Sequence, residues 1–216
     1  MGLSRLLIAN RGEVAVRIMR TASEMGITTI AVYSQDDAEC LHAMKADESV
    51  PLAGSGPAAY LDIDALVAVA LASKCDAVHP GWGFLSENAA FADACRAAGL
   101  IFVGPAGDTL RAVGDKTRAR RLARENGVPV LHGSDGPVTL EKAHDFLRGL
   151  GSGGAAMLKA VAGGGGRGMR LVTSAEELET AYARCQSEAA RAFGDGSVYV
   201  EEAMPRARHI EVQIAG

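Results

Sequence analysis

Four consecutive glycines, Gly163 to Gly166, are the residues of this sequence that most directly suggest chemistry. Glycine lets backbone amides approach phosphate oxygens closely and adopt positive φ angles. Lys159 lies on the apolar stretch that leads into the glycines, where its ammonium group could sit beside the same phosphates. The pattern predicts a loop that binds a phosphorylated ligand. A hairpin tip without a ligand is the plainer alternative.

Two common phosphate-binding motifs fit this loop poorly. Gly163-x-Gly165-x-x-Gly168 matches the dinucleotide fingerprint, but that motif needs a helix after its glycines, and residues 169–172 have the pattern of a strand. A Walker A loop needs a Gly-Lys-Ser/Thr ending, which is absent. The first predicted strand-to-helix turn has only Gly12, so Asp36 downstream of it gains no support as a ribose-binding acid. We therefore interpret the glycines as the flexible tip of a hairpin lid that closes over a ligand.

The composition is that of an ordinary globular protein. The 216 residues are 48% hydrophobic and 22% charged, enough for one large domain or two small ones. No apolar run reaches the length of a membrane span and no signal peptide is evident, so we expect a cytoplasmic protein. A formal charge of −4 argues against general nucleic-acid binding. The 4 cysteines show no paired spacing, which favours reduced thiols over a disulfide framework or a zinc site.

The elements that must position the loop change character along the chain. The first hundred residues alternate predicted strands (6–9, 27–33, 49–52, 77–79, 101–103) with predicted helices (13–25, 63–73, 89–98). Strands that alternate with helices predict βαβ units and an α/β fold with a parallel sheet.

The second half opens with a predicted basic helix over about 108–126. We interpret most of its cations as a solvated face and set Lys116 apart; they are Arg111, Lys116, Arg118, Arg120, Arg121 and Arg124. A helix over 140–150 and strands over 156–161 and 169–172 follow, the strands flanking the glycines. A Ser174-x-x-Glu177 capping box opens a helix to about residue 193, followed by strands at 197–202 and 209–214. Because that last strand begins a new part of a sheet, we expect a truncated piece of a longer protein.

Three stretches together resemble the biotin carboxylase family of ATP-grasp enzymes. They are Leu-Ile-Ala-Asn-Arg-Gly-Glu-Val-Ala-Val-Arg-Ile (7–18), His-Pro-Gly-Trp-Gly-Phe-Leu-Ser-Glu-Asn (79–88), and 163–169 taken with 201–213. The segments 102–105, 114–116 and 133–137 fit the same order. The resemblance implies a Rossmann-like parallel-sheet domain over 1–104, a connecting helix over 105–130, an ATP-grasp lid subdomain over 131–203, and the first strand of a truncated ATP-grasp core over 204–216.

The resemblance also implies a reaction and its participants. In this family ATP activates bicarbonate as carboxyphosphate, and the carboxyl group passes to biotin on a carrier protein or domain. ATP, Mg²⁺ and biotin are the implied cofactors, with a carboxyltransferase subunit as partner and a homodimer as a possible assembly. We expect the parent to be an acyl-CoA carboxylase of fatty acid metabolism. The family's catalytic residues and metal ligands lie after residue 216, so the isolated chain is expected to be inactive and to hold no metal.

The resemblance assigns site residues by position. Lys116 and Lys159 contact the nucleotide phosphates, and the amides of Gly163, Gly164, Gly165 and Gly166 cover them. The adenine lies against Glu201, Glu202, Ala203 and Met204, with the Glu201 side chain reading its amino edge, Met169 packing nearby and His209 facing the ribose or phosphates. Trp82, Gly83 and Glu87 mark the biotin and bicarbonate end of the cleft. Trp82 and Ala162 depart from the family pattern, which often has tyrosine and a fifth glycine there.

Three other functions stay open. A different ATP-grasp ligase that activates another carboxylate is disfavoured by the 79–88 string. A standalone nucleotide-binding or interaction module would need no residues beyond the chain. An NAD-linked dehydrogenase is the least favoured, because the dinucleotide motif fails.

Overall fold

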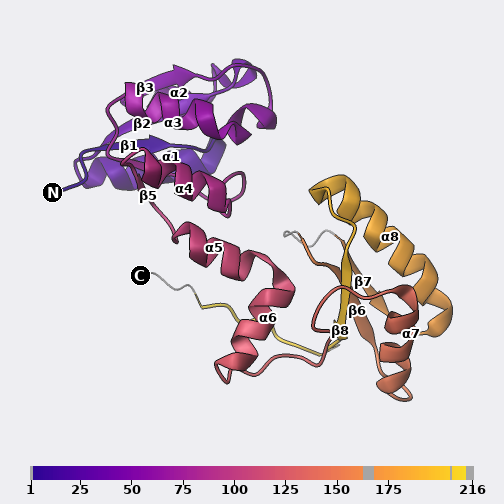
Figure 1. The fold of residues 1–216 in the computed structure, drawn as a ribbon. Helices are drawn as coiled ribbons and strands as arrows, with labels where there is room; N and C mark the ends of the chain where they lie inside the picture. Colours follow the sequence, from indigo (N-terminus) through magenta and orange to yellow (C-terminus); the bar gives the residue numbers. More distant parts are fainter. Residues whose placement is uncertain (1, 163–167, 205, 213–216) are drawn as a thin grey trace. The chain divides into compact units, whose positions relative to one another are not determined.

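The computed structural model describes residues 2–162, 168–204 and 206–212, so the predicted phosphate-covering glycines, Gly163 to Gly166, lie outside the described residues. The chain divides into two compact units, Met1–Arg111 and Ala112–Gly216, and each is described by itself (Figure 1). None of the helices in these described ranges combines the length and apolar character needed to cross a bilayer.

The first unit is a doubly wound α/β layer, as the alternation of strands and helices predicts. Its five parallel strands lie in the order β3-β2-β1-β4-β5; they are β1 (Arg5–Ile8), β2 (Thr28–Tyr33), β3 (Glu48–Pro51), β4 (Ala77–His79) and β5 (Ile101–Phe102). The helices are α1 (Gly12–Glu24), α2 (Leu41–Lys45), α3 (Ile63–Ala72) and α4 (Ala89–Ala97), with 3₁₀ turns at Gln35–Asp37 and Pro57–Leu61. Helix α2 and the turns escape sequence analysis because they are too short to show a helical period.

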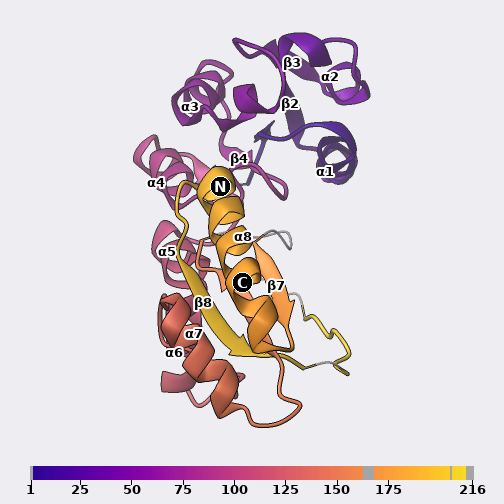
Figure 2. The ribbon, with the colours of Figure 1, turned by 90° about the vertical axis from the view of Figure 1, so that its right-hand side faces the viewer.

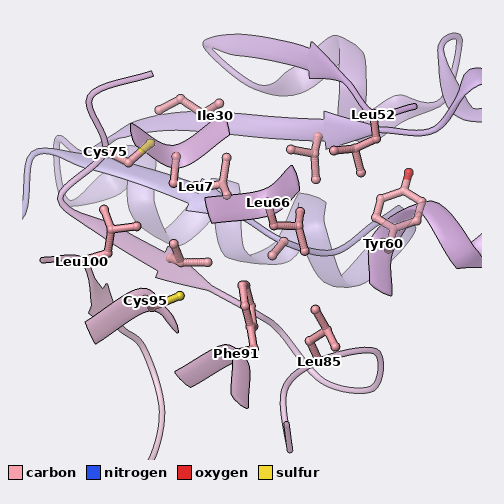
Figure 3. Close-up of a cluster of buried hydrophobic side chains, with 14 of the residues drawn as sticks. Leu7, Ile30, Leu52, Tyr60, Leu66, Cys75, Leu85, Phe91, Cys95 and Leu100 are labelled. Carbon is pink, nitrogen blue, oxygen red and sulfur yellow. The ribbon is translucent and has the colours of Figure 1, made fainter. Parts of the chain in front are cut away.

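Both faces of the sheet are buried at its centre, which explains why β1 and most of β2 are apolar, whereas the edge strand β3 is mostly exposed and begins with Glu48 and Ser49. Leu7 and Ile30 pack with Leu66 of α3 and Phe91 of α4 on one face (Figure 3). Leu6 and Ile8 point to the other face, where Met19 of α1 covers them. The side-chain alternation along β1 thus divides its residues between two cores.

The second unit is built on the three-stranded antiparallel sheet β7-β6-β8. Its strands are β6 (Ala156–Ala160), β7 (Met169–Val172) and β8 (Val198–Glu202). The antiparallel pairing of β6 with β7 confirms the predicted hairpin around the glycines. Helices α7 (Leu140–Gly149) and α8 (Ala175–Phe193) pack on one face, over a core that includes Leu158, Leu178 and Val200 (Figure 2).

Three local predictions in this half are wrong. The predicted basic helix is two helices, α5 (Gly107–Gly114) and α6 (Lys116–Glu125). They separate because the Asp115 carboxylate caps α6, accepting hydrogen bonds from the amides of Thr117 (2.8 Å) and Arg118 (2.9 Å). These bonds hold the pKa of Asp115 below its ordinary value, the Arg118 amide first among them, although burial opposes the shift.

The predicted capping box at the start of α8 does not form. Ser174 makes no side-chain cap, and Glu177 instead accepts hydrogen bonds from the amide (3.3 Å) and hydroxyl (3.2 Å) of Thr173.

The strand predicted from His209 is not present over residues 209–212, which are irregular. Ile210 and Val212 are each 75% exposed. Alternating apolar residues form a strand only where a neighbouring strand supplies hydrogen bonds, and the described residues offer none there.

Candidate functional site

Charged side chains gather on the face of the β7-β6-β8 sheet opposite α7 and α8. Leu158 and Val200 point to the helices, so the intervening residues of the same strands, Lys159, Tyr199 and Glu201, point the other way. Lys159 lies directly opposite Tyr199 in the β6–β8 register, and opposite Met169 in the β6–β7 register. The hairpin therefore brings Lys159, Met169 and Glu201 onto one surface.

Glu201 is the centre of this group. Its side chain is only 6% exposed, and it forms ion pairs with the Lys159 ammonium group and with Nη1 of Arg120, the latter at 3.0 Å. Both carboxylate oxygens are therefore engaged, one by each cation. Burial, followed by the nearby Glu201 charge, raises the pKa of Tyr199, so this neighbour stays neutral.

Lys116 reaches the same region from another element. It is the first residue of α6, and its Nζ lies 3.4 Å from the backbone oxygen of Ala160, the residue after Lys159. The Asp115 cap fixes the start of α6 and thereby the position from which Lys116 projects. The two predicted phosphate-binding lysines thus both lie at the end of β6.

The residues predicted to hold adenine occupy the end of β8 and the chain after it. The amides of Glu202 and Ala203 donate to the carbonyls of His132 and Ala155, each at 2.8 Å. The Glu202 side chain is exposed, and Met204 is 60% exposed. His209 has an 86% exposed imidazole, 3.9 Å from the Glu211 carboxylate, and the structure does not bring it into the Glu201 cluster.

Arg120 is the residue that sequence reasoning missed. Its predicted place was the solvated face of a basic helix, but its side chain is 12% exposed and paired with Glu201. The prediction is wrong for this residue because the segment after α6 folds back over it. The only hint in the sequence was the segment 133–137, which fits the family pattern without an evident role.

The predicted biotin and bicarbonate end belongs to the first unit and follows β4. Gly81 donates its amide to Nδ1 of His79 at 3.0 Å, and the buried Asn10 side chain donates to the carbonyls of Pro80 (2.7 Å) and Trp82 (3.0 Å). These bonds hold the loop against the carboxyl end of β1. The Trp82 side chain is 74% exposed and borders an open, mostly apolar hollow of about 500 Å³ along α1.

Gly83 and Glu87, the other two residues of that end, lie in the turn that leads to α4. Gly83 has φ +72 and accepts the amide of Ser86 at 2.9 Å, and Glu87 is exposed. Asn88 then caps α4, accepting from the amide of Phe91 at 3.0 Å. Most of the 79–88 string therefore builds a turn and a helix cap, and presents Trp82 and Glu87 to solvent.

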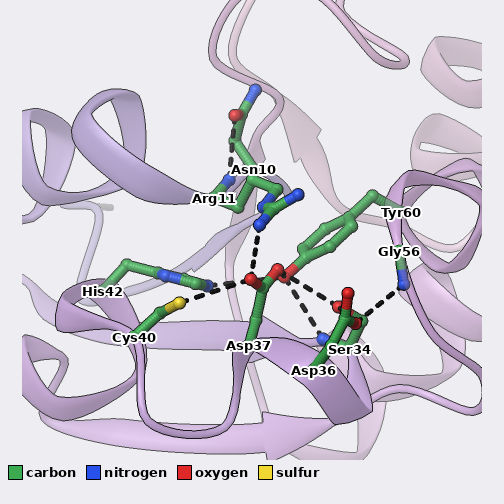
Figure 4. A network of polar contacts seen from close by, with 9 residues as sticks. All are labelled: Asn10, Arg11, Ser34, Asp36, Asp37, Cys40, His42, Gly56 and Tyr60. Atoms are coloured by element: carbon green, nitrogen blue, oxygen red, sulfur yellow. Dashed lines mark hydrogen bonds and ion pairs between the residues drawn. The ribbon is translucent and has the colours of Figure 1, made fainter.

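A second polar cluster lies at the carboxyl ends of β1 and β2 in the first unit (Figure 4). Asp37 is buried and ion-paired with Arg11, and it accepts hydrogen bonds from Tyr60 (2.7 Å), Ser34 (3.1 Å) and the Cys40 thiol (3.3 Å). Burial opposes ionisation of Asp37, but Tyr60, Cys40, Ser34 and Arg11 outweigh it and hold its pKa below the ordinary value. Burial and Asp37 raise the pKa of Tyr60 to about 12.

The cluster around Glu201 is the better candidate for binding an anion. Two cations, Arg120 and Lys159, share a single carboxylate there. The Lys116 ammonium group lies at the end of β6, the strand that carries Lys159. A partly buried excess of positive charge attracts phosphate groups more strongly than the same charges would in water. Across residues 2–162, 168–204 and 206–212, no group of His, Cys, Asp and Glu could by itself hold a metal ion.

Comparisons with known proteins agree over the whole chain. Residues 2–110 match the family described as biotin carboxylase, N-terminal domain, and residues 115–216 match the family described as carbamoyl-phosphate synthase L chain, ATP binding domain. Mitochondrial pyruvate carboxylase of Homo sapiens is 49% identical over 99% of this chain, which covers 18% of that protein.

Two solved structures are similar in fold and sequence. The biotin carboxylase of Campylobacter jejuni, a complex described as beta-gamma-ATP, is 41% identical with a TM-score of 0.89, covering 94% of this chain and 46% of that one. The biotin carboxylase domain dimer of Hydrogenobacter thermophilus 2-oxoglutarate carboxylase, with MgADP, ADP and bicarbonate, is 37% identical with a TM-score of 0.88, covering 95% and 45%. The chain thus spans less than half the length of these relatives.

Proposed function

The chain belongs to the biotin carboxylase family, as its motifs predict, and from this premise we propose that it carries the lid and part of the ATP site of a biotin carboxylase. The parent enzyme would use ATP and bicarbonate to carboxylate biotin on a carrier protein or domain. The observation that carries the proposal is that Lys116 reaches the end of β6, where Lys159 lies one residue away and pairs with the buried Glu201.

The residues of this chain would contribute positioning and charge. ATP supplies the phosphoryl group that activates bicarbonate, and such a transfer depends mainly on alignment and on neutralising the phosphate oxygens. Lys116 and Lys159 would contact the phosphates, and the amides of Gly163 to Gly166 would cover them. Glu201 to Met204, with Met169 and His209, would border the adenine and ribose.

The Mg²⁺ ion that accompanies ATP would need ligands of its own. Hard oxygen ligands such as carboxylates usually hold Mg²⁺ together with phosphate oxygens and water, and the described residues offer no such group. We propose that the protein ligands of Mg²⁺ and the catalytic residues belong to the part of the family's sequence that follows these 216 residues. The isolated chain would then bind nucleotide without turning it over.

Calorimetric titration of this chain with ATP, in the presence of Mg²⁺, tests the nucleotide site. We expect saturable binding that Lys159→Met weakens at least about tenfold, because a charge-assisted hydrogen bond contributes roughly 1.5–3 kcal/mol. Lys142→Met is the matched control, since Lys142 is exposed on α7 at the opposite face of the sheet. Absence of ATP binding, or equal affinities for wild type and Lys159→Met, would contradict the proposal.

A second measurement tests whether the catalytic residues are absent from this chain. ATP hydrolysis dependent on bicarbonate and free biotin should be undetectable for these 216 residues. Turnover would show that the chain contains its own catalytic groups, and that part of the proposal would be withdrawn.

The most specific part of the proposal is the identity of the final acceptor of the carboxyl group. An acyl-CoA carboxylase of fatty acid metabolism is the prediction from sequence, but the human relative at 49% identity is a pyruvate carboxylase. Pyruvate is therefore the second candidate acceptor. Assays of the longer protein with acetyl-CoA and with pyruvate would separate the two. We also propose that the longer protein works with a carrier protein or domain and a carboxyltransferase, forms a homodimer and is located in the cytoplasm.

Another ATP-grasp ligase remains the second candidate function, since residues 115–216 match a carbamoyl-phosphate synthase description. The longer protein would then consume ATP with another carboxylate and without biotin, whereas a biotin carboxylase requires bicarbonate and biotin.

A further inference from the structure

Arg120 differs from the other arginines of α6 in its surroundings. Its side chain is 12% exposed, whereas that of Arg121 is 65% exposed and that of Arg124 is 41% exposed. Arg121 lies 3.9 Å from Glu125 of its own helix, and Arg124 pairs with Asp135. Arg120 alone among these three turns inward, to Glu201, 81 residues away in the sequence.

The guanidinium of Arg120 is fixed at two points. Nη1 donates to Oε2 of Glu201 at 3.0 Å, and Nη2 donates to the backbone oxygen of Leu131. Its Nε is buried and has no partner among the described residues. A planar group held by both terminal nitrogens has little freedom to rotate, so it presents one N–H to Glu201 in a defined direction.

The segment after Leu131 closes the other side of this contact. It runs beside β8, with hydrogen bonds of 2.8 Å from Glu202 to His132 and from Ser134 to Val200, and Gly133 forms a bridge with Glu201. A Cβ on Gly133 would lie 2.7 Å from Nη2 of Arg120, 2.9 Å from Cβ of Glu201 and 2.9 Å from the Val200 oxygen. Only glycine fits here without a shift, so the backbone itself packs against the Arg120–Glu201 pair.

The two cationic partners of Glu201, Arg120 and Lys159, differ in how firmly the protein holds them. Lys159 lies on the strand that leads to the proposed phosphate site and is 23% exposed, whereas Arg120 is held by the protein backbone. Were Lys159 the sole partner, its movement to a phosphate would leave a buried carboxylate without a counter-charge, which is strongly unfavourable. With Arg120 in place, Glu201 stays paired when Lys159 leaves.

We propose that Arg120 is a positioning residue of the ATP site, which retains the Glu201 carboxylate through Nη1 so that the Lys159 ammonium group is released to the nucleotide phosphates. The inference rests on the proposed nucleotide-binding function. Arg120 acts through Glu201 and Lys159 and makes no contact with the nucleotide itself. The alternative is a purely structural ion pair that holds α6 to β8.

A double-mutant cycle on ATP affinity separates these two roles. The four proteins are wild type, Arg120→Met, Glu201→Gln and the double variant, titrated with ATP and Mg²⁺ by calorimetry. We expect Arg120→Met to weaken ATP binding about tenfold in the wild-type background, because Lys159 then remains on Glu201. In the Glu201→Gln background the same change should alter the affinity less than about twofold, since no carboxylate then retains Lys159.

Two further variants complete the design. Arg121→Met removes an exposed arginine from the same helix and should leave ATP affinity unchanged. Arg120→Lys keeps the charge but loses the two-point contact, so it should restore part of the affinity lost in Arg120→Met. If Arg120→Met fails to fold, as judged by circular dichroism, Arg120→Lys takes its place in the cycle, with a smaller expected loss.

Each outcome decides between the roles. An unchanged affinity in Arg120→Met, or an equal loss in both Glu201 backgrounds, would overturn the inference while leaving the proposed function intact. If the wild-type chain did not bind ATP, the proposed function would be contradicted, and the inference would fall with it. A loss that disappears in the Glu201→Gln background would support both.

Discussion

Asp37 in the first unit and Glu201 in the second are both buried carboxylates that accept a hydrogen bond from an arginine. Asp37 has one cationic partner, Arg11, and its other donors are the neutral groups of Tyr60, Ser34 and Cys40. Glu201 has two cationic partners, Arg120 and Lys159. The charge around Asp37 is satisfied within the fold, whereas an excess of positive charge surrounds Glu201.

This difference separates a structural cluster from the proposed binding cluster. The Asp37 network ties the ends of β1 and β2 to the 3₁₀ turn at Pro57–Leu61, through contacts that need no external group (Figure 4). The positive excess around Glu201 would be neutralised by the phosphates of the proposed nucleotide. An arginine paired with a buried carboxylate can therefore be structural or functional, and the charges of all its neighbours must be counted to distinguish the two.

The largest expected effect comes from Asp37→Asn. The variant removes the buried carboxylate that is ion-paired with Arg11, and we expect the free energy of unfolding of the first unit to fall by about 3 kcal/mol. ATP affinity should stay within about twofold of wild type, because Asp37 takes no part in the proposed site. Hydrogen exchange at the amides of β1 and β2 measures the first effect and calorimetry the second. A loss of ATP binding in the folded variant would remove the distinction between the two clusters.

Adding a methyl group at two crowded glycines compares the units directly. At Gly81, which has φ +66, a Cβ would lie 2.6 Å from Val14 and 2.7 Å from Asn10; at Gly133 it would meet Arg120 and Glu201. We expect Gly81→Ala and Gly133→Ala each to cost roughly 1–3 kcal/mol of stability. Only Gly133→Ala should also weaken ATP binding.

Gly149→Ala serves as the control for this pair, since nothing lies within 4 Å of a Cβ there. Thermal unfolding and ATP titration of the three variants provide the measurements. Equal effects of Gly81→Ala and Gly133→Ala on ATP affinity would contradict the comparison.

The smallest expected effect is a pH dependence of the first unit. Burial lowers the pKa of His42 and of His79, so both stay neutral in the folded unit at pH values where an unfolded histidine, with a pKa of about 6.5, takes up a proton. The unfolded chain binds more protons as the pH falls, so stability should decrease by on the order of 1 kcal/mol between pH 7 and 5.5. The depressed pKa of Asp37 adds its own loss only in more acidic solution, below its unfolded value of about 3.9.

Hydrogen exchange at the amides of β1 and β4 in the two buffers measures this change. His79→Gln, which retains an acceptor for the Gly81 amide, should lose part of the dependence. Equal protection at both pH values would show that the two histidines do not couple folding of the first unit to protons.

Local patterns were enough to predict much of the fold. The alternation of apolar strands and amphipathic helices predicted the parallel sheet, and the β6–β7 hairpin follows from the two short strands around the glycines. The break between α5 and α6 was also legible, because Gly114 followed by Asp115 is the pattern of a helix end and a cap. The prediction of one continuous helix was wrong because it extended the run of basic residues across this helix boundary.

The strand predicted from His209 failed for a different reason. Its alternation is real, but a strand is completed by hydrogen bonds from a neighbour, and an alternating sequence carries no information about whether one is present. Ile210 and Val212 consequently remain exposed.

The sequence by itself determined most of the strands and helices and the family, because these depend on short-range periodicity and on motifs of contiguous residues. Only the tertiary structure decided which arginine of α6 turns inward to Glu201. Arg120 and Arg121 are equivalent in local pattern, and what separates them is a contact across 81 residues together with a backbone segment that closes over one of them. Helix periodicity cannot encode such a contact, since it arises only when α6, β8 and the segment at Gly133 have packed together.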